Sequence, residues 1–306
     1  MSGMSEVLGK AFAFILIIVV GYVLKKKGFF HADDFYLLSR IVLRITLPAA
    51  IVSNFSKISM DNSLLFMTVL GLGANIALVA VGYLVNLRKT KMDKAFDMLN
   101  ISGYNIGNFT LPFVQSFLGP IGFATTSLFD AGNSVMCTGA TYTLASMVVG
   151  SEEKASVKNI LRSLFSSLPF DAYIIMTILA VFRVQLPSVV TSFASTVGGA
   201  NAFLALLMIG IGCEIHMDKD KISEIIKLMV LRYGTALIFA MAAFFLLPFP
   251  LEVRQALAIV AFGPVSSVSP AFTGRLGGDV ELASAVNSLS ILLSIVAITI
   301  ALIVIL

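Results

Sequence analysis

The chain has 306 residues, of which 58% are hydrophobic and only 12% are charged, with a formal net charge of +4. At a mean hydropathy of +0.97, the few charged residues could not cover a water-exposed surface. This composition excludes a soluble globular domain and predicts a protein that crosses the bilayer many times. The apolar runs are continuous, without the alternation typical of a membrane β-barrel, so we expect helical spans.

We predict an all-α polytopic membrane protein. The first apolar run continues into "KKKGFF" without a signal-peptide cleavage pattern, so it is expected to be a retained span. Residues 151–168 form the most polar internal stretch, which predicts a cytoplasmic linker with a short interfacial helix between halves 1–150 and 169–306. Ten spans are expected, at 7–24, 35–55, 63–86, 95–118, 120–149, 169–183, 188–212, 223–247, 253–274 and 280–305.

Basic residues in the connections predict the orientation. Alternate connections hold fourteen of them, namely Lys25, Lys26, Lys27, Arg88, Lys89, Lys91, Lys94, Lys154, Lys158, Arg162, Lys219, Lys221, Lys227 and Arg275. The other side holds four, which are Lys10, Lys57, Arg183 and Arg254. The side rich in Lys and Arg is normally cytoplasmic. We therefore expect a protein of the cell membrane with both termini on the outer side. The net positive charge is thereby explained without a nucleic-acid partner.

The two halves resemble each other at a constant offset of 158 residues. This offset aligns "NIGNFTLP" (105–112) with "GPVSSVSP" (263–270), and "PFVQSFLG" (112–119) with "PAFTGRLG" (270–277). Five spans in each half would give the halves opposite orientations. Inverted repeats of this kind are typical of secondary transporters, whose sites lie at mid-membrane on broken helices.

Proline and glycine predict a break in the fourth and the ninth span. Pro112 prevents normal bonding of the Asn108 carbonyl, so an unwound link is expected near 108–111 with a half-helix starting at Pro112. Pro270 is expected to act in the same way in the other half, with Ser269 as N-cap. Two half-helix N-termini would then direct free N–H groups at one place, which suits a carboxylate. The alternative is a pair of proline kinks whose polar groups satisfy one another.

Polar residues at these breaks are the candidate ligands. The predicted substrate-binding set is Asn105, Gly107, Asn108, Pro112, Ser266, Ser267, Ser269 and Pro270, together with Asn201 in the seventh span. Asp130 lies about ten residues into the fifth span, ~15 Å deep, where an acid is a candidate for proton or cation coupling. Asn133 and Asn287 are further candidates for ion coupling. The alternative is a protonated Asp130 that hydrogen-bonds a neighbouring helix.

Motifs for other functions are missing from the sequence. There is no P-loop, no H-E-x-x-H metal site and no cysteine pattern for a metal, so we expect neither an enzyme nor a bound cofactor. The only small partner expected besides the substrate is a coupling proton or sodium ion.

Four stretches resemble the auxin efflux carrier family, which includes plant PIN carriers and bacterial organic-anion permeases. "NIGNFTLP" is similar to the N-x-G-N-x-x-x-P signature of that family. The other three stretches are "LPAAIVSNF" (47–55), "NAFLALLMIGIG" (201–212) and "GGDVELASAVNSLSILLS" (277–294). The resemblance covers nearly the whole chain, and the absence of a long hydrophilic loop between the halves resembles the bacterial type.

This resemblance implies ten helices in two inverted repeats, in the fold shared with bile acid/sodium symporters. It also implies a homodimer and an elevator mechanism, in which a transport domain (helices 3–5 and 8–10) slides against a scaffold (helices 1, 2, 6 and 7). The crossover prolines of the family correspond to Pro112 and Pro270, and its site asparagines to Asn105 and Asn108. The serine-rich second crossover departs from the family pattern, so specificity for auxin does not carry over.

The sequence therefore predicts a secondary active transporter that moves a small organic anion, a carboxylate, across the cell membrane. The alternatives are a sodium- or proton-coupled symporter of the bile-acid type, a channel, and an intramembrane enzyme.

Overall fold

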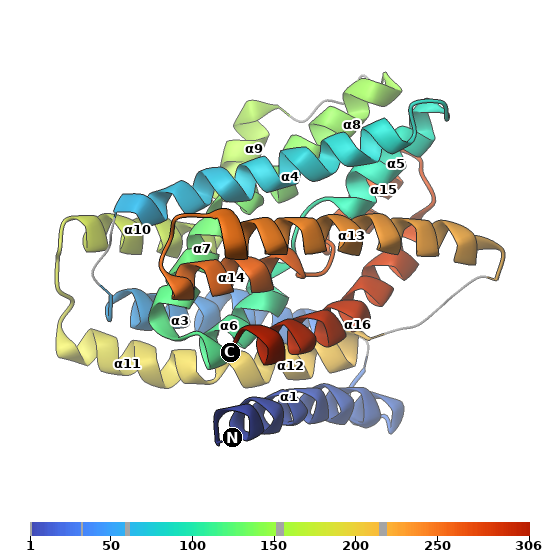
Figure 1. Ribbon diagram of the computed structural model, residues 1–306. Coiled ribbons are helices and arrows are strands. Elements are labelled where there is room, and N and C mark those ends of the chain that lie inside the picture. Colours follow the sequence, from blue (N-terminus) through green and yellow to red (C-terminus); the bar gives the residue numbers. More distant parts are fainter. Residues whose placement is uncertain (1, 32, 59–61, 151–155, 214–218) are drawn as a thin grey trace.

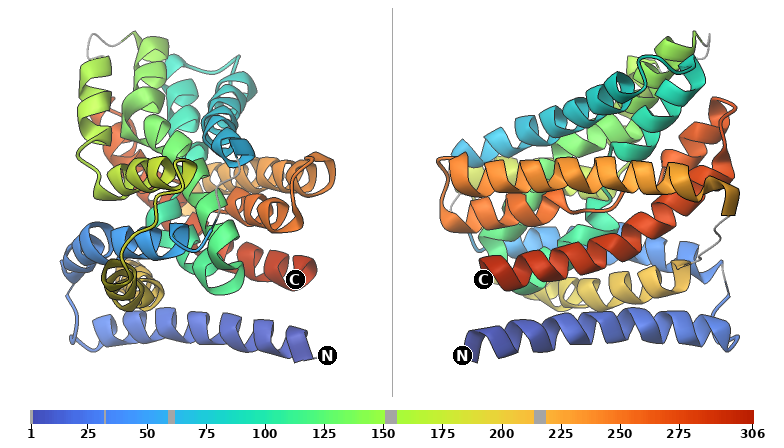
Figure 2. Two further views of the ribbon diagram at one scale, coloured as in Figure 1. Left: turned by 90° about the vertical axis from the view of Figure 1, so that its left-hand side faces the viewer. Right: turned by 45° about the vertical axis from the view of Figure 1, so that its right-hand side comes forward.

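The computed structural model describes residues 2–31, 33–58, 62–150, 156–213 and 219–306. These residues fold into helices joined by short connections, without a strand among them, as the sequence predicts. Figure 1 shows that the long helices run roughly along one common direction. The first and the last helix bring the two ends of the chain close to one another in every view of Figures 1 and 2.

The first half of the chain forms eight helices. They are α1 (Ser2–Lys26), α2 (Asp34–Ile41), α3 (Leu47–Phe55), α4 (Phe66–Val85), α5 (Lys91–Ile101), α6 (Leu111–Phe117), α7 (Gly119–Val135) and α8 (Thr141–Val149). A π-helical turn, Val42–Thr46, joins α2 to α3, so residues 34–55 are one continuous helical segment. Similar turns precede α6 and separate α7 from α8.

The second half of the chain also forms eight helices. They are α9 (Val157–Leu164), α10 (Leu168–Val181), α11 (Ser188–Gly199), α12 (Asn201–Gly212), α13 (Ile222–Leu246), α14 (Leu251–Ala261), α15 (Ser269–Arg275) and α16 (Val280–Ile305). The short helix α9 lies in the predicted linker and has Ser156 as its N-cap, whose hydroxyl accepts from the Lys158 N–H. Linker residues 151–155 lie outside the described part of the chain.

Fewer helices than predicted are long and apolar enough to cross a membrane. Within the described residues there are six, Leu8–Lys26, Asp34–Phe55, Ser63–Val85, Ser188–Gly212, Ile222–Leu246 and Val280–Ile305. The pair α9 and α10, bent by 77°, gives a seventh candidate. The predicted spans 95–118 and 253–274 are each two short helices. Span 120–149 is divided near Gly139, whose φ of 153° interrupts the helix, so the predicted count of ten is not confirmed.

Close helix crossings depend on glycine. A Cβ at Gly210 on α12 would lie 2.1 Å from the carbonyl oxygen of Ile18 on α1. A Cβ at Gly132 on α7 would lie 2.0 Å from the carbonyl oxygen of Thr68 on α4. Because small residues allow helix backbones to touch, these crossings fix α1 to α12 and α4 to α7. In both figures α1 lies along one side of the molecule and α4, α5, α8 and α9 lie on the opposite side.

Candidate functional site

The first broken helix unwinds earlier than predicted. Helix α5 ends at Ile101, residues 102–105 are not helical, and a π-helical turn, Ile106–Thr110, leads into α6. Pro112 lies in the first turn of α6, as expected. The helix nevertheless resumes at Ile106 and not at the proline. In a π-helical turn each carbonyl bonds the N–H five residues later, one residue further than in an α-helix. Here the Ile106 carbonyl accepts from the Leu111 N–H, so the chain is already helical before Pro112.

The second broken helix has its link between α14 and α15. Helix α14 ends at Ala261, and α15 begins at Ser269 with Pro270 in its first turn. The prediction that Ser269 caps this helix is wrong, because its hydroxyl donates to the Leu99 carbonyl oxygen at 2.8 Å. Ser269 therefore ties the second broken helix to the last turns of α5.

The two links cross in direct contact. The Asn105 N–H donates to the Pro264 carbonyl oxygen at 2.9 Å, so one link bonds the backbone of the other. Gly103 has a φ of 73°, and a Cβ there would lie 2.7 Å from the Ser266 Cβ. Only glycine combines this left-handed backbone with such a close approach. The crossing therefore depends on glycine in the first link.

Two buried asparagines satisfy the unwound backbone of the first link. Asn133 on α7 accepts from the Tyr104 N–H at 3.0 Å and donates to the Tyr104 carbonyl at 2.8 Å. Asn75 on α4 accepts from the Gly103 N–H at 2.8 Å and donates to the Asn133 side chain at 3.1 Å. Backbone groups inside a membrane protein need such partners. Asn75 was not predicted, although a lone amide in an apolar span is a signal for it.

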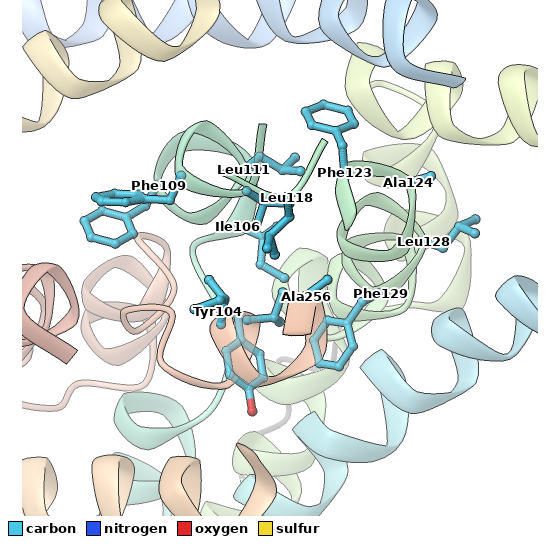
Figure 3. Close-up of a cluster of buried hydrophobic side chains, with 14 of the residues drawn as sticks. Tyr104, Ile106, Phe109, Leu111, Leu118, Phe123, Ala124, Leu128, Phe129 and Ala256 are labelled. Carbon is cyan, nitrogen blue, oxygen red and sulfur yellow. The ribbon is translucent and has the colours of Figure 1, made fainter. Parts of the chain in front are cut away.

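Apolar side chains pack behind the link and hold it in place. Figure 3 shows Ile106 of the first broken helix near Ala256 of α14, in one buried cluster with Phe109, Leu111 and Phe129. The Tyr104 and Phe129 rings meet edge to face, with centroids 5.6 Å apart. The link therefore has one apolar side and one polar side.

Asp130 lies beside the first link and joins two elements. Its Oδ1 accepts from Asn133 at 2.8 Å, and its Oδ2 accepts from the hydroxyl of Tyr173 on α10 at 3.0 Å. The carboxyl group also approaches Gly107, where a Cβ would lie 3.9 Å from Oδ2. Tyr173 is a partner that sequence reasoning missed, because nothing in a single tyrosine of an apolar helix identifies it.

A buried arginine joins the two broken helices. Arg232 on α13 is 1% exposed, and its Nη1 and Nη2 donate to the carbonyl oxygens of Ile101 and Gly263, both at 2.8 Å. Its guanidinium lies 4.1 Å from the centre of the Tyr104 ring. These carbonyls lie at the C-terminal ends of α5 and α14, where a cation is favourable.

A polar cavity of about 230 Å³ lies at the crossing. Seven of the predicted site residues line it: Asn105, Gly107, Asn108, Asp130, Asn133, Ser266 and Ser267. Leu43, Leu47, Phe170 and Tyr173 close it on the other side. The Asn108 side-chain oxygen is buried there without a hydrogen-bond partner among the described residues. An unpaired buried oxygen of this kind is a position for a ligand that donates a hydrogen bond.

The other predicted site residues do not line the cavity. Pro112, Ser269 and Pro270 lie in the helices that follow the links. Asn287 on α16 donates to the carbonyls of Val265 and Ser266 and supports the second link from behind. Asn201 is fully buried between other elements. It accepts from the Thr46 hydroxyl at 3.0 Å and donates to the Gln115 side chain at 3.3 Å.

The apolar helices fit a helical, multi-pass membrane protein, and a cavity lies inside it where the two interrupted helices cross. The family model described as membrane transport protein (Mem_trans) matches residues 7–302. Because this match covers almost the whole chain, the protein belongs to that family, the auxin efflux carrier family. The resemblance seen in the sequence is thereby confirmed. A search of curated proteins finds no match to the chain.

Proposed function

We propose that the protein is an elevator-type secondary active transporter that carries a small organic anion, a carboxylate, across the cell membrane. The observation that carries this proposal is the cavity at the crossing of the two broken helices. Its polar wall contains the unpaired Asn108 oxygen and the start of the helical segment that leads into α6.

The chemistry of the cavity suits a carboxylate that carries a donor group. The first N–H groups of a helix have no partner within it, and here they belong to Ile106, Gly107 and Asn108. Such N–H groups and the positive end of the helix dipole favour an anion. The Asn105 and Asn108 side chains and the Ser267 hydroxyl add donors and acceptors around the same space. A volume of about 230 Å³ restricts the substrate to a small molecule.

The contacts between helices support a division into two moving bodies. Glycine contacts fix α1 to α12, and α4 to α7. A third such contact fixes α11 to α3, where a Cβ at Gly198 would lie 2.7 Å from Ala50. Each pair falls within either the scaffold (α1–α3 and α10–α12) or the transport domain (α4–α8 and α13–α16). The cavity lies between the bodies, since Leu47 and Tyr173 belong to the scaffold and Asn108 and Asp130 to the transport domain.

Few polar contacts join the two bodies near the site. One is the hydrogen bond from Tyr173 to Asp130. Another is made by Gln115 on α6, which donates to the Gly198 carbonyl oxygen at 3.2 Å and accepts from Asn201. Both would have to break if the transport domain slides. The ten-span inverted repeat, the homodimer and the external position of both termini belong to the same proposal.

Asp130 favours proton-coupled transport as the second candidate. A carboxylate substrate in this cavity would lie near the Asp130 carboxylate, and two negative charges 4 Å apart repel by about 4 kcal/mol at an effective dielectric constant of 20. Protonation of Asp130 removes this repulsion. Binding of the anion would therefore carry one proton with it, whereas a sodium-coupled symporter is the alternative that keeps Asp130 charged.

Counterflow in proteoliposomes tests the proposed function. Vesicles loaded with unlabelled monocarboxylates or dicarboxylates should accumulate the labelled form of the transported anion. Asn108→Ala should abolish this exchange, since it removes a side chain that lines the cavity. Asn159→Ala, on the exposed face of α9, is the matched control and should exchange normally. Full exchange by Asn108→Ala would overturn the assignment of the site.

A further inference from the structure

A larger cavity of about 880 Å³ lies away from the crossing. It is formed by the end of α3, the end of α10, the connection to α11 and the first turns of α11. Figure 1 shows this region at the left, where the chain passes from α10 to α11. All of these elements belong to the proposed scaffold. The cavity is therefore separate from the substrate site.

Two cations line this cavity. Lys57 follows the end of α3, and Arg183 follows the end of α10. Both residues are exposed, so their charges reach the mouth of the cavity. None of the described lining residues is acidic. Among the described residues that line it, the cavity therefore presents a positively charged mouth.

Arg183 has the backbone conformation that is normal for glycine. Its φ is 55°, and it is the only described residue other than glycine with a positive φ. The Val184 N–H bonds the Leu179 carbonyl at 2.8 Å, which closes α10 with a turn that usually has glycine at this position. An arginine is disfavoured there. A disfavoured conformation that carries a charged side chain to a cavity points to a role in binding.

The rest of the lining is divided by polarity. Met176 and Leu179 form an apolar inner wall, and hydroxyl groups such as those of Ser188 and Ser192 lie near the mouth. Beside it, Phe182 and Val189 are 75% and 78% exposed. Exposed apolar side chains around a cationic, hydroxyl-rich mouth match the boundary between hydrocarbon and headgroups.

We infer that this cavity binds an anionic phospholipid. The headgroup phosphate lies between Lys57 and Arg183 and accepts from the nearby hydroxyl groups, and an acyl chain follows the apolar wall formed by Met176 and Leu179. A soluble anion would use the two cations but not the apolar wall. The lipid would hold the scaffold in the membrane while the transport domain moves.

Native mass spectrometry of the full-length protein in detergent tests this inference. Phosphatidylglycerol and phosphatidylcholine of the same acyl chains are added separately, and the lipid adducts are counted. At about 0.2–1 kcal/mol for each exposed ion pair, two cations predict an approximately 2- to 30-fold preference for phosphatidylglycerol. Lys57→Ala combined with Arg183→Gly should remove this preference. Arg183→Gly alone should leave the lipid-free protein at least as heat-stable, since glycine suits the backbone.

A control variant removes the same charge elsewhere. Lys158→Ala combined with Arg162→Ala on α9 should keep the preference for phosphatidylglycerol. Inorganic phosphate at millimolar concentration should not displace the lipid. Any one of three results would overturn the inference. The two lipids could bind equally, the Lys57/Arg183 variant could keep the preference, or inorganic phosphate could displace the lipid. The assay does not depend on transport, so failure of the proposed function would leave its result unaffected.

Discussion

Replacing Arg232 with methionine removes a buried cation that bonds the backbone of both broken helices. Methionine keeps much of the apolar stem but removes the two charge-assisted hydrogen bonds to Ile101 and Gly263. Each such bond contributes about 1.5–3 kcal/mol. In the wild type, burial of the guanidinium on folding costs several kcal/mol of lost hydration, which offsets part of the stabilisation from the two bonds. Two buried carbonyls without partners remain, so we expect a net destabilisation of about 2–4 kcal/mol.

Thermal stability monitored by size-exclusion chromatography in detergent measures this effect. Arg232→Lys should be intermediate, because an ammonium keeps the charge but lacks the planar fork that reaches both carbonyls. Arg254→Met is the matched control, since Arg254 donates one bond, to the Phe244 carbonyl, from a half-buried position. If Arg232→Met lowers stability no more than Arg254→Met, the argument that Arg232 holds the crossing together is refuted.

Further predictions concern coupling, the crossing and orientation. Asp130→Asn mimics the protonated acid, so it should bind the anion independently of pH, whereas the wild type should bind more tightly as pH falls; an unchanged pH profile in binding measurements would exclude proton coupling through Asp130. Gly103→Ala should lower thermal stability by about 1–3 kcal/mol, because its backbone is left-handed and the other link is in contact. Gly73→Ala, with open space around it, should not lower stability, and equal losses would contradict this account. Cysteines placed at residues 2 and 156 should react with impermeant reagents from outside and inside the cell respectively; the reverse pattern would overturn the orientation.

The sequence predicted the breaks because their causes are local. Proline and glycine act on the turns next to them, so Pro112 and Pro270 could be assigned to the starts of short helices. The details near each break depended on distant residues. Ser269 bonds the Leu99 carbonyl and does not cap its own helix, because α5 lies against α15 in the fold. No local pattern contains that information.

The partners of the site were harder to predict than its ligands. Asn105, Asn108 and Asp130 are polar residues in unusual positions, and the structure brings all three to one cavity. Tyr173 bonds Asp130 from 43 residues away, and Arg232 reaches Ile101 across 131 residues. Contacts at such separations arise from tertiary packing. A lone arginine within an apolar helix signals a buried role, but not which carbonyls it bonds.

Protection of Cys137 tests the location of the substrate site most directly. Cys137 lines the cavity and is one of only two cysteines in the chain. In a Cys213→Ser background, a small methanethiosulfonate reagent should modify Cys137, and the rate should fall as the transported anion is added. The concentration for half protection should match that for half-maximal counterflow. An unchanged rate at saturating anion would contradict binding at the crossing of the two broken helices.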